Sequence, residues 1–176
     1  RKVCRAVGRA IHTLSLCLLL AMMFGTAAAA LPIPQSGWSV LYVDSQETVG
    51  QDGAASNAID GDPLTIWHTQ WKGASPGYPH ELRINLGALY EVDGFRLLPR
   101  QNGSVNGRIY EYEFYVSMDG INWGDPVAAG FFADNPLEHQ IDFVRVTARY
   151  VRLVALSEVN GKPWSSLAEL NVLGVP

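Results

Sequence analysis

Cysteine is nearly absent from this sequence and is confined to its first seventeen residues. The 176-residue chain contains two cysteines, Cys4 and Cys17. Beyond residue 17 there is consequently no disulfide, no thiol nucleophile and no thiolate ligand for a metal. A domain formed by the later part of the chain must therefore be stabilised by burial and hydrogen bonding alone.

The sequence also lacks an apolar run long enough to span a membrane. The almost unbroken run Leu14–Phe24 has 11 residues, whereas a transmembrane helix needs about 20. Small residues follow it in TAAAA (26–30), and a basic start precedes it, formed by Arg1, Lys2, Arg5 and Arg9. This order is typical of secretory signals. We therefore predict a signal peptide over residues 1–30, cleaved after Ala30 or, as the alternative, after Ala28, and a secreted, extracellular protein.

Basic residues are scarce after this segment. Four of the 13 lysines and arginines lie in the first 30 residues, which leaves nine against 17 acidic residues and a net charge of about −8. An acidic chain without a basic cluster repels phosphate backbones. The composition therefore argues against nucleic acid as a partner.

No segment after residue 30 has a sustained helical period. Short runs of β-favouring residues alternate with turn residues instead. The runs are WSVLYV (38–43), HELRINL (80–86), VDGFRLL (92–98), EYEFYVSM (111–118), HQIDFV (139–144), RYVRLVAL (149–156) and AELNVL (168–173). Seven or eight short strands predict an all-β fold, an antiparallel sandwich or barrel. We place one domain at residues 38–174, after a short linker at 31–37.

Within three of these runs, apolar residues alternate with polar ones. Side chains two positions apart on a strand point to the same face. The expected core stripes are Leu82, Ile84 and Leu86; Tyr112, Phe114 and Val116; and Val151, Leu153 and Ala155. The residues between strands, including QNGSVNG and VNGKP, tolerate turn geometry. Function in such folds is usually carried by the loops at one end.

Motifs of catalysis are missing. The sequence has no GxSxG, no HExxH and no spaced Cys/His cluster, and no spacing singles out a pair of carboxylates for glycoside hydrolysis. His68 stands alone between Trp67 and Thr69, and a lone histidine is more often structural than functional. We therefore predict that the domain is not an enzyme.

The stretch NAIDGDPLTIWHTQW (57–71) offers oxygen ligands in a tight loop. Asp60, Asp62 and Thr65 suit calcium, which prefers hard oxygen donors. An EF-hand is excluded because its twelfth position, counted from Asp60, is Trp71 rather than Glu. Glu169, near the end of the chain, is a candidate distant ligand if the two ends meet. The alternative is that DGDP is a simple turn in which both aspartates bond their own backbone.

Two further segments suit carbohydrate. LPRQNGSVNG (98–107) carries Arg100 and Asn106, whose side chains supply donors and acceptors for hydroxyl groups, and GKPWSS (161–166) carries Trp164. An exposed indole can cover the apolar face of a sugar ring. The alternatives are that Arg100 pairs with a surface carboxylate and that Trp164 belongs to the core.

Five motifs occur together in one order: NAIDGDPLTIWHT, LPRQNGSVNG, YEFYVSMDGINW, ARYVRLVAL and GKPWSSLAELNVLG. In this respect the chain resembles the galactose-binding-like discoidin (factor V/VIII type C) superfamily. Within that superfamily it is similar to carbohydrate-binding module family 32 and to the amino-terminal domain of galactose oxidase. The resemblance covers residues 38–174. It implies an eight-stranded antiparallel jelly-roll β-sandwich with adjacent termini.

The resemblance also implies two sites. A structural calcium would be bound by Asn57, Asp60, Asp62, Thr65, Ala168 and Glu169. A galactose-type sugar would be bound by His68, Arg100 and Asn106, with Trp71 and Trp164 against its ring. Some members have a Glu near position 51, where this chain has Gln51, so the identity of the sugar stays open. Binding is expected to be weak, with a Kd of about 10 µM to 1 mM.

The resulting interpretation is a secreted, calcium-stabilised, non-catalytic module that holds itself or an attached enzyme near glycans containing galactose. One alternative is a structural amino-terminal domain of a larger galactose-oxidase-like or glycosidase enzyme. Another is a discoidin domain that binds phospholipid or protein; the acidic charge and the polar NGSVNG loop argue against it, and no membrane insertion is expected. Asn102 begins an Asn-Gly-Ser acceptor for N-glycosylation, beside the proposed sugar loop.

Overall fold

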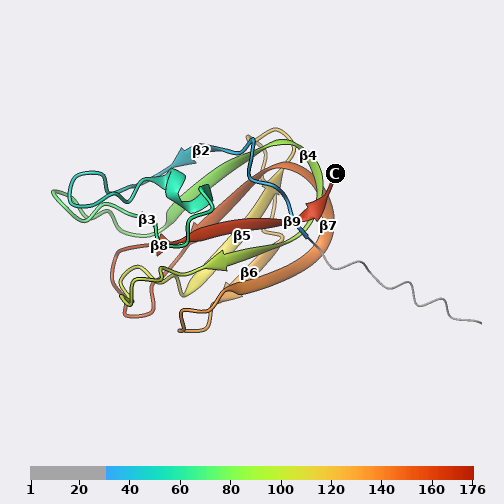
Figure 1. The fold of residues 1–176 in the computed structure, drawn as a ribbon. Helices are drawn as coiled ribbons and strands as arrows, with labels where there is room; N and C mark the ends of the chain where they lie inside the picture. The colour runs from blue at the N-terminus through green and yellow to red at the C-terminus, as the bar shows by residue number, and fades with distance from the viewer. Residues whose placement is uncertain (1–30) are drawn as a thin grey trace, which may run out of the picture.

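Two long strands organise the fold. The computed structural model describes residues 31–176, and in it β4 (His80–Leu98) and β7 (His139–Ala155) pair antiparallel along both of their halves (Figure 1). The register runs from His80 opposite Ala155 to Leu97 opposite His139, with a shift between Asn85 and Tyr90. Each strand bends at this shift and passes from one layer of the sandwich into the other.

Four of the strands predicted as separate are halves of two longer strands, which differs from the sequence analysis. The runs at 80–86 and 92–98 are halves of β4, and the runs at 139–144 and 149–156 are halves of β7 up to Ala155, because the two strands turn together and keep their pairing. Gly87 allows the bend in β4. It has φ +83, and a Cβ there would lie 2.7 Å from the carbonyl oxygen of Gly37, so only glycine fits.

The two layers share β4 and β7 and are otherwise made of different strands. One layer contains β2 (Ser39–Val43), β5 (Glu111–Ser117) and β6 (Ala128–Phe131), and the other contains β1 (Leu31–Pro32) and β9 (Glu169–Val175). When the halves of β4 and β7 are counted separately and two-residue strands are left aside, the sandwich has eight strands. The predicted all-β jelly roll is therefore confirmed. β6 was not predicted, because AAGF has no alternating pattern.

The segment at residues 31–37, predicted as a linker, belongs to the sandwich. Leu31 and Pro32 pair with Gly174 and Leu173 of β9. Ile33 is buried and donates its backbone N–H to Val172 at 2.8 Å. Burial of the apolar side chain of Ile33 against β9 stabilises the folded state. The two ends of the described chain consequently lie side by side (Figure 1).

The core lies between the two layers. All nine residues of the three predicted core stripes are buried, which confirms the alternation seen in the sequence. Aromatic rings fill the centre: Phe95 stacks on Phe114 with ring centroids 4.1 Å apart, and Tyr112 stacks on Phe132 at the same distance. Such pairs add to the stabilisation that burial alone provides.

The bends of β4 and β7 lie at the same end of the sandwich as the termini, and the ends of both strands lie at the other (Figure 1). The long loops gather at this second end, together with the two-residue strands β3 (Trp67–His68) and β8 (Ser166–Leu167) and the 3-10 helix η1 (Ala55–Ile59). The predicted signal peptide at 1–30 lies outside the described residues. No helix formed by residues 31–176 is long and apolar enough to cross a membrane.

Truncation of the central ring tests the core. We expect Phe95→Ala to lower the free energy of unfolding by about 3–5 kcal/mol, because Phe95 is fully buried and its loss leaves a cavity. The matched control is Phe131→Ala, since Phe131 is 63% exposed and its ring centroid lies 5.1 Å from that of Tyr110 at the surface; the substitution should cost about 1 kcal/mol or less. Urea unfolding measures both, and equal losses in the two variants would contradict this description of the core.

Candidate functional site

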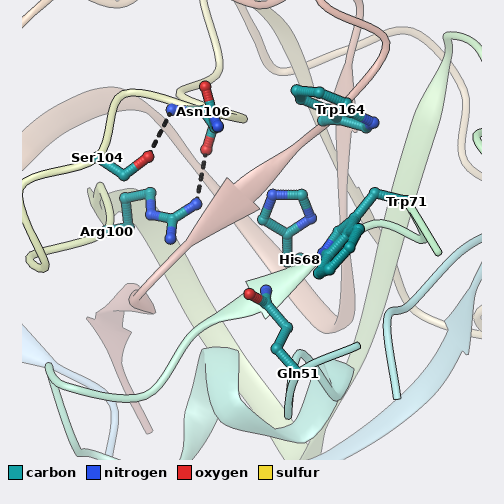
Figure 2. Close-up of a pocket in the computed structure, with 7 residues that line it drawn as sticks. All are labelled: Gln51, His68, Trp71, Arg100, Ser104, Asn106 and Trp164. Atoms are coloured by element: carbon teal, nitrogen blue, oxygen red, sulfur yellow. Dashed lines mark hydrogen bonds between the residues drawn. The ribbon is translucent and has the colours of Figure 1, made fainter. Parts of the chain in front are cut away.

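The loops at the end opposite the termini enclose one pocket of about 290 Å³. All five residues that the sequence predicted for sugar binding line it, together with two more (Figure 2). The lining residues are Gln51, His68, Trp71, Arg100, Ser104, Asn106 and Trp164. They come from four separate segments of the chain, which the fold brings together.

His68 provides a hydrogen-bond acceptor. It lies in β3, is 3% exposed, and has Nδ1 2.6 Å from the carbonyl oxygen of Thr69. Because a carbonyl oxygen can only accept, Nδ1 carries the proton of the neutral ring and Nε2 is left as an acceptor. Burial lowers the pKa of His68, and the charge of Arg100 lowers it further. The ring is therefore neutral at pH 7.

Arg100 provides a charged donor. Its Nε donates to Oδ1 of Asn102 at 2.9 Å, and its Nη1 donates to the carbonyl of Asn106 at 3.0 Å (Figure 2). The residue is 7% exposed. Burial lowers the pKa of Arg100, yet a guanidinium stays charged at neutral pH. Within residues 31–176 no carboxylate lies within ion-pair distance of it, so the predicted alternative of a surface ion pair does not hold.

Three side chains hold the loop that follows Arg100 by bonding the main chain of Asn106. The carbonyl of Asn106 accepts from Arg100 and from the hydroxyl of Ser166, the latter at 2.9 Å, and its N–H bonds the hydroxyl of Ser104. These bonds use only the main chain of Asn106. Its side-chain amide lies at the rim of the pocket (Figure 2), where it can both donate and accept.

Two tryptophans form the apolar walls. Trp71 is 41% exposed, and a Cβ on Gly50 would lie 2.6 Å from its ring, so the glycine is needed for the ring to take this place. Trp164 is half-buried, and its Nε1 donates to Ser75 at 3.0 Å. Its ring centroid lies 6.3 Å from that of His68. The alternative that Trp164 belongs to the core does not hold.

Gln51 also lines the pocket, beside His68 and Trp71 (Figure 2). Its Nε2 is buried and has no hydrogen-bond partner among the described residues. An unpaired buried donor costs free energy, which a ligand oxygen would recover. The amide is neutral, so it supplies a polar group without the negative charge that a Glu would bring.

Glu47 was not predicted, although it holds one wall of the pocket. It is fully buried, and its carboxylate accepts four backbone N–H groups at 2.7–2.9 Å. The donors are Val49, Gly50, Trp71 and Lys72. The bonds from Gly50 and Trp71 contribute most to lowering the pKa of Glu47 to about 2. The sequence gives no sign of this role, since an acidic residue is most often exposed.

Glu158 holds the opposite side in the same manner. It is 3% exposed, and it accepts N–H groups from Gly107 at 3.3 Å, from Asn160 at 2.6 Å and from Lys162 at 3.0 Å. It thereby joins the segment after Asn106 to the segment before Trp164. Two buried carboxylates, Glu47 and Glu158, thus fix the loops that carry most of the pocket.

The predicted calcium ligands converge at a second place, beside η1. Thr65 Oγ1 lies 2.8 Å from a carboxylate oxygen of Asp60, 3.0 Å from the carbonyl of Asp62 and 3.5 Å from the carbonyl of Asn57. The predicted turn is present as well, because Asp60 Oδ1 accepts the N–H of Asp62 at 2.8 Å. The turn and the ligand set are therefore compatible with each other.

Glu169 brings a second carboxylate to this loop from β9, directly after the buried Ala168. Burial raises the pKa of Glu169 to about 7, and the neighbouring carboxylate of Asp60 contributes to the rise. Oε1 of Glu169 is buried without a partner among residues 31–176. In the same range no group of three or more His, Cys, Asp or Glu side chains could hold a metal. A cation here would depend on carbonyl and hydroxyl oxygens besides two carboxylates, a donor set that fits calcium.

The sequence matches the family model of the F5/8 type C domain over residues 42–170. The chain belongs to this family. Its resemblance to the discoidin superfamily, predicted from five motifs, is confirmed.

Solved structures place the domain among family 32 carbohydrate-binding modules. It is similar to such a module from Clostridium perfringens in complex with GalNAc-β-1,3-galactose, with a TM-score of 0.74 and 37% identity over 81% of this chain and 99% of that chain. It is also similar to a family 32 module from the same organism in complex with galactose, with a TM-score of 0.69 and 36% identity over 81% and 97% of the two chains.

Two curated enzymes contain a similar segment. The chain is 44% identical to a sialidase of Micromonospora viridifaciens over 143 residues, which are 81% of this chain and 22% of the sialidase. It is 41% identical to a galactose oxidase of Gibberella zeae over 170 residues, which are 96% of this chain and 24% of the oxidase. The chain thus spans about a quarter of the length of these relatives.

The carboxylate of Glu47 makes the stability of the domain depend on pH in the acid range. Folding lowers its pKa from 4.5 to about 2, so the stabilisation is present above pH 4.5 and is lost as the pH falls toward 2. We expect Glu47→Gln to lower Tm at pH 7, because the amide offers one acceptor oxygen where the carboxylate offers two. The gap between the variant and the unmodified protein should narrow between pH 5 and pH 2.

Calorimetric melting across this pH range measures the gap. Glu138→Gln is the matched control, because Glu138 is 41% exposed at its side chain and lies 3.9 Å from Arg96; its Tm should follow the unmodified protein at every pH. A constant gap for Glu47→Gln at all pH values would show that the negative charge contributes nothing.

Proposed function

We propose that this domain is a secreted, non-catalytic carbohydrate-binding module that recognises galactose-type sugars and is stabilised by a structural calcium ion. Its task is to keep itself, or an enzyme attached to it, close to glycans that carry galactose. The fold and the family support carbohydrate binding. Preference for galactose, binding of calcium, secretion and the lack of catalysis go beyond the fold and the family and are proposed here.

The pocket itself carries this proposal. It combines an acceptor on neutral His68, a charged donor on Arg100 that has no carboxylate partner in residues 31–176, and two indole faces. A hydroxyl group both donates and accepts, so His68 and Arg100 together can bond a single sugar hydroxyl. An axial hydroxyl, such as the one that distinguishes galactose from glucose, leaves the opposite face of the ring apolar and free for an indole.

The solved relatives support the same class of ligand. Two family 32 modules with TM-scores of 0.74 and 0.69 to this chain are bound to GalNAc-β-1,3-galactose and to galactose. Two of the curated relatives are a sialidase and a galactose oxidase, each more than four times as long as the segment that matches this chain. An attached enzyme domain is therefore part of the proposal as a partner.

Calcium would be held by the loop beside η1. The carboxylates of Asp60 and Glu169 approach each other there, and the buried Oε1 of Glu169 has no partner among the described residues. A divalent cation would offset the repulsion between the two carboxylates and supply the missing partner. Because Asp60 follows η1 and Glu169 begins β9, the ion would join distant parts of the chain.

Secretion rests on residues 1–30, where a basic start, a short apolar run and small residues occur in the order of a signal peptide.

Calorimetric titration with galactose, and with glucose for comparison, tests the sugar. We expect saturable binding of galactose with a Kd of about 10 µM to 1 mM and weaker binding of glucose. Arg100→Ala should weaken galactose binding about tenfold or more, because a hydrogen bond from a charged donor is lost. Arg96→Ala is the matched control, since Arg96 lies on the outer surface beside Glu138 and should leave binding unchanged. Absence of heat with both sugars would leave a structural domain of a larger enzyme as the better interpretation.

Thermal melting with calcium and with a chelator tests the ion. We expect calcium to raise Tm, because it binds the folded state only, and we expect Asp60→Ala to abolish the rise. Asp62→Ala is the control: we propose that Asp62 binds the ion through its backbone carbonyl, which lies 3.0 Å from Thr65 Oγ1 within the ligand set and which the variant keeps. Equal Tm values with calcium and chelator in the unmodified protein would rule the calcium site out.

A further inference from the structure

One buried histidine outside the pocket lining has both ring nitrogens bonded to acceptors. His80, at the start of β4, is 0% exposed. Its Nδ1 lies 2.8 Å from a carboxylate oxygen of Asp44, and its Nε2 lies 2.9 Å from the carbonyl oxygen of Pro163. Neither partner can donate, so both nitrogens must carry a proton for both bonds to form. His80 in this arrangement is an imidazolium.

The second of these bonds reaches the pocket. Pro163 directly precedes Trp164, whose ring is one wall of the pocket. The hydroxyl of Tyr78 donates to the carbonyl of Trp164, and the Tyr78 ring lies 4.8 Å from that of His80, centroid to centroid. The carbonyls of two consecutive residues, Pro163 and Trp164, are thus held by His80 and by a tyrosine whose ring packs against it.

The first bond anchors the histidine to the neighbouring strand of its own layer, since β2 pairs with the first half of β4. Asp44 follows β2, and its second carboxylate oxygen accepts the N–H of Glu81 at 2.6 Å. The imidazolium is therefore fixed at one nitrogen by an ion pair with a carboxylate that is itself held by β4. A neutral ring keeps one proton, and the charge of Asp44 favours its staying on Nδ1, so loss of the other proton would break the bond to Pro163 and release that loop.

We propose that His80 is a positioning residue of the sugar pocket: as an imidazolium clamped to Asp44, it holds Pro163 and so sets the place of Trp164, and sugar affinity depends on its proton. This inference rests on the proposed function, because it acts on the same pocket. His80 itself would not contact the sugar, yet its loss of a proton would weaken sugar binding at alkaline pH.

The surroundings of His80 agree with a charged ring. Burial lowers its pKa, but the hydrogen bonds to Asp44 and Pro163 together with the charge of Asp44 outweigh burial, and the pKa lies above its ordinary value of 6.5. The other titratable groups that face it are Tyr78 and, more distantly, His68, which is neutral at pH 7. On the neighbouring strand β7 its partner is Ala155, which carries no charge.

The sign of the pH effect follows from this shift. A raised pKa in the folded state means that the contribution of His80 is complete below pH 6.5 and is lost as the pH rises through the folded-state pKa. Sugar affinity should therefore decrease on the alkaline side. On the acid side, protonation of His68 removes the acceptor of the pocket and should decrease affinity independently.

The test is a series of calorimetric titrations with galactose from pH 5 to pH 10, together with an NMR titration of the His80 ring in the sugar-free protein. We expect affinity to fall about three- to tenfold, the effect of one lost hydrogen bond, with the same midpoint as the NMR signal of His80. The indole N–H signal of Trp164 should shift with that midpoint as well. An affinity that is unchanged while His80 titrates would overturn the proposal.

Asp44→Asn separates positioning from a general effect of pH. It removes the negative charge beside His80, so the alkaline midpoint should move to lower pH. Asp93→Asn is the matched control, because Asp93 is also a poorly exposed aspartate in an ion pair, with Arg145, away from the pocket; its profile should be that of the unmodified protein. An unmoved midpoint in Asp44→Asn would reject the role of His80, whereas absence of galactose binding at every pH would reject the proposed function itself.

Discussion

The antiparallel pairing of β4 with β7 is the constraint on which the rest of the domain depends. These two strands pair in both layers, and every other strand of the sandwich except the β3–β8 pair is added to one of them or to a strand beside them. Their joint bend places both ends of each strand at one end of the sandwich. The segments that leave these ends carry Arg100 on one side and approach Trp164 on the other, so the pocket is a consequence of the strand pairing.

The loops around the pocket have little regular secondary structure. Hydrogen bonds to buried charged groups hold them instead. The carboxylates of Glu47 and Glu158 accept backbone N–H groups from segments that no strand ladder joins, and His80 donates to a loop carbonyl. Such groups would be costly to bury alone. Because each of them bonds backbone groups of a loop, it stabilises one loop conformation and holds the pocket residues in place.

Much of the fold could be predicted from sequence, because its signals are local. The core stripe Leu82, Ile84 and Leu86 follows from alternation, and the pocket residues follow from the motifs by which the chain resembles a known family. The continuity of β4 was not predictable, because Gly87 resembles a turn residue and only the pairing with β7 shows that the strand continues. Glu47 and His80 were missed for a related reason: each bonds backbone groups of a segment distant in sequence, Glu47 those of Trp71 and Lys72 and His80 that of Pro163, and such a bond leaves no pattern in the sequence.

The adjacent termini have a further consequence for how such a module works. Leu31 pairs with Gly174 at one end of the sandwich, while the pocket opens at the other. Both ends of the described chain therefore lie away from the pocket, and a domain attached at the carboxyl end would be joined at the far end of the module from an approaching glycan. The orientation of the bound glycan relative to a neighbouring domain would then be set by the flexibility of the connecting chain, and one module could serve partners of different shape.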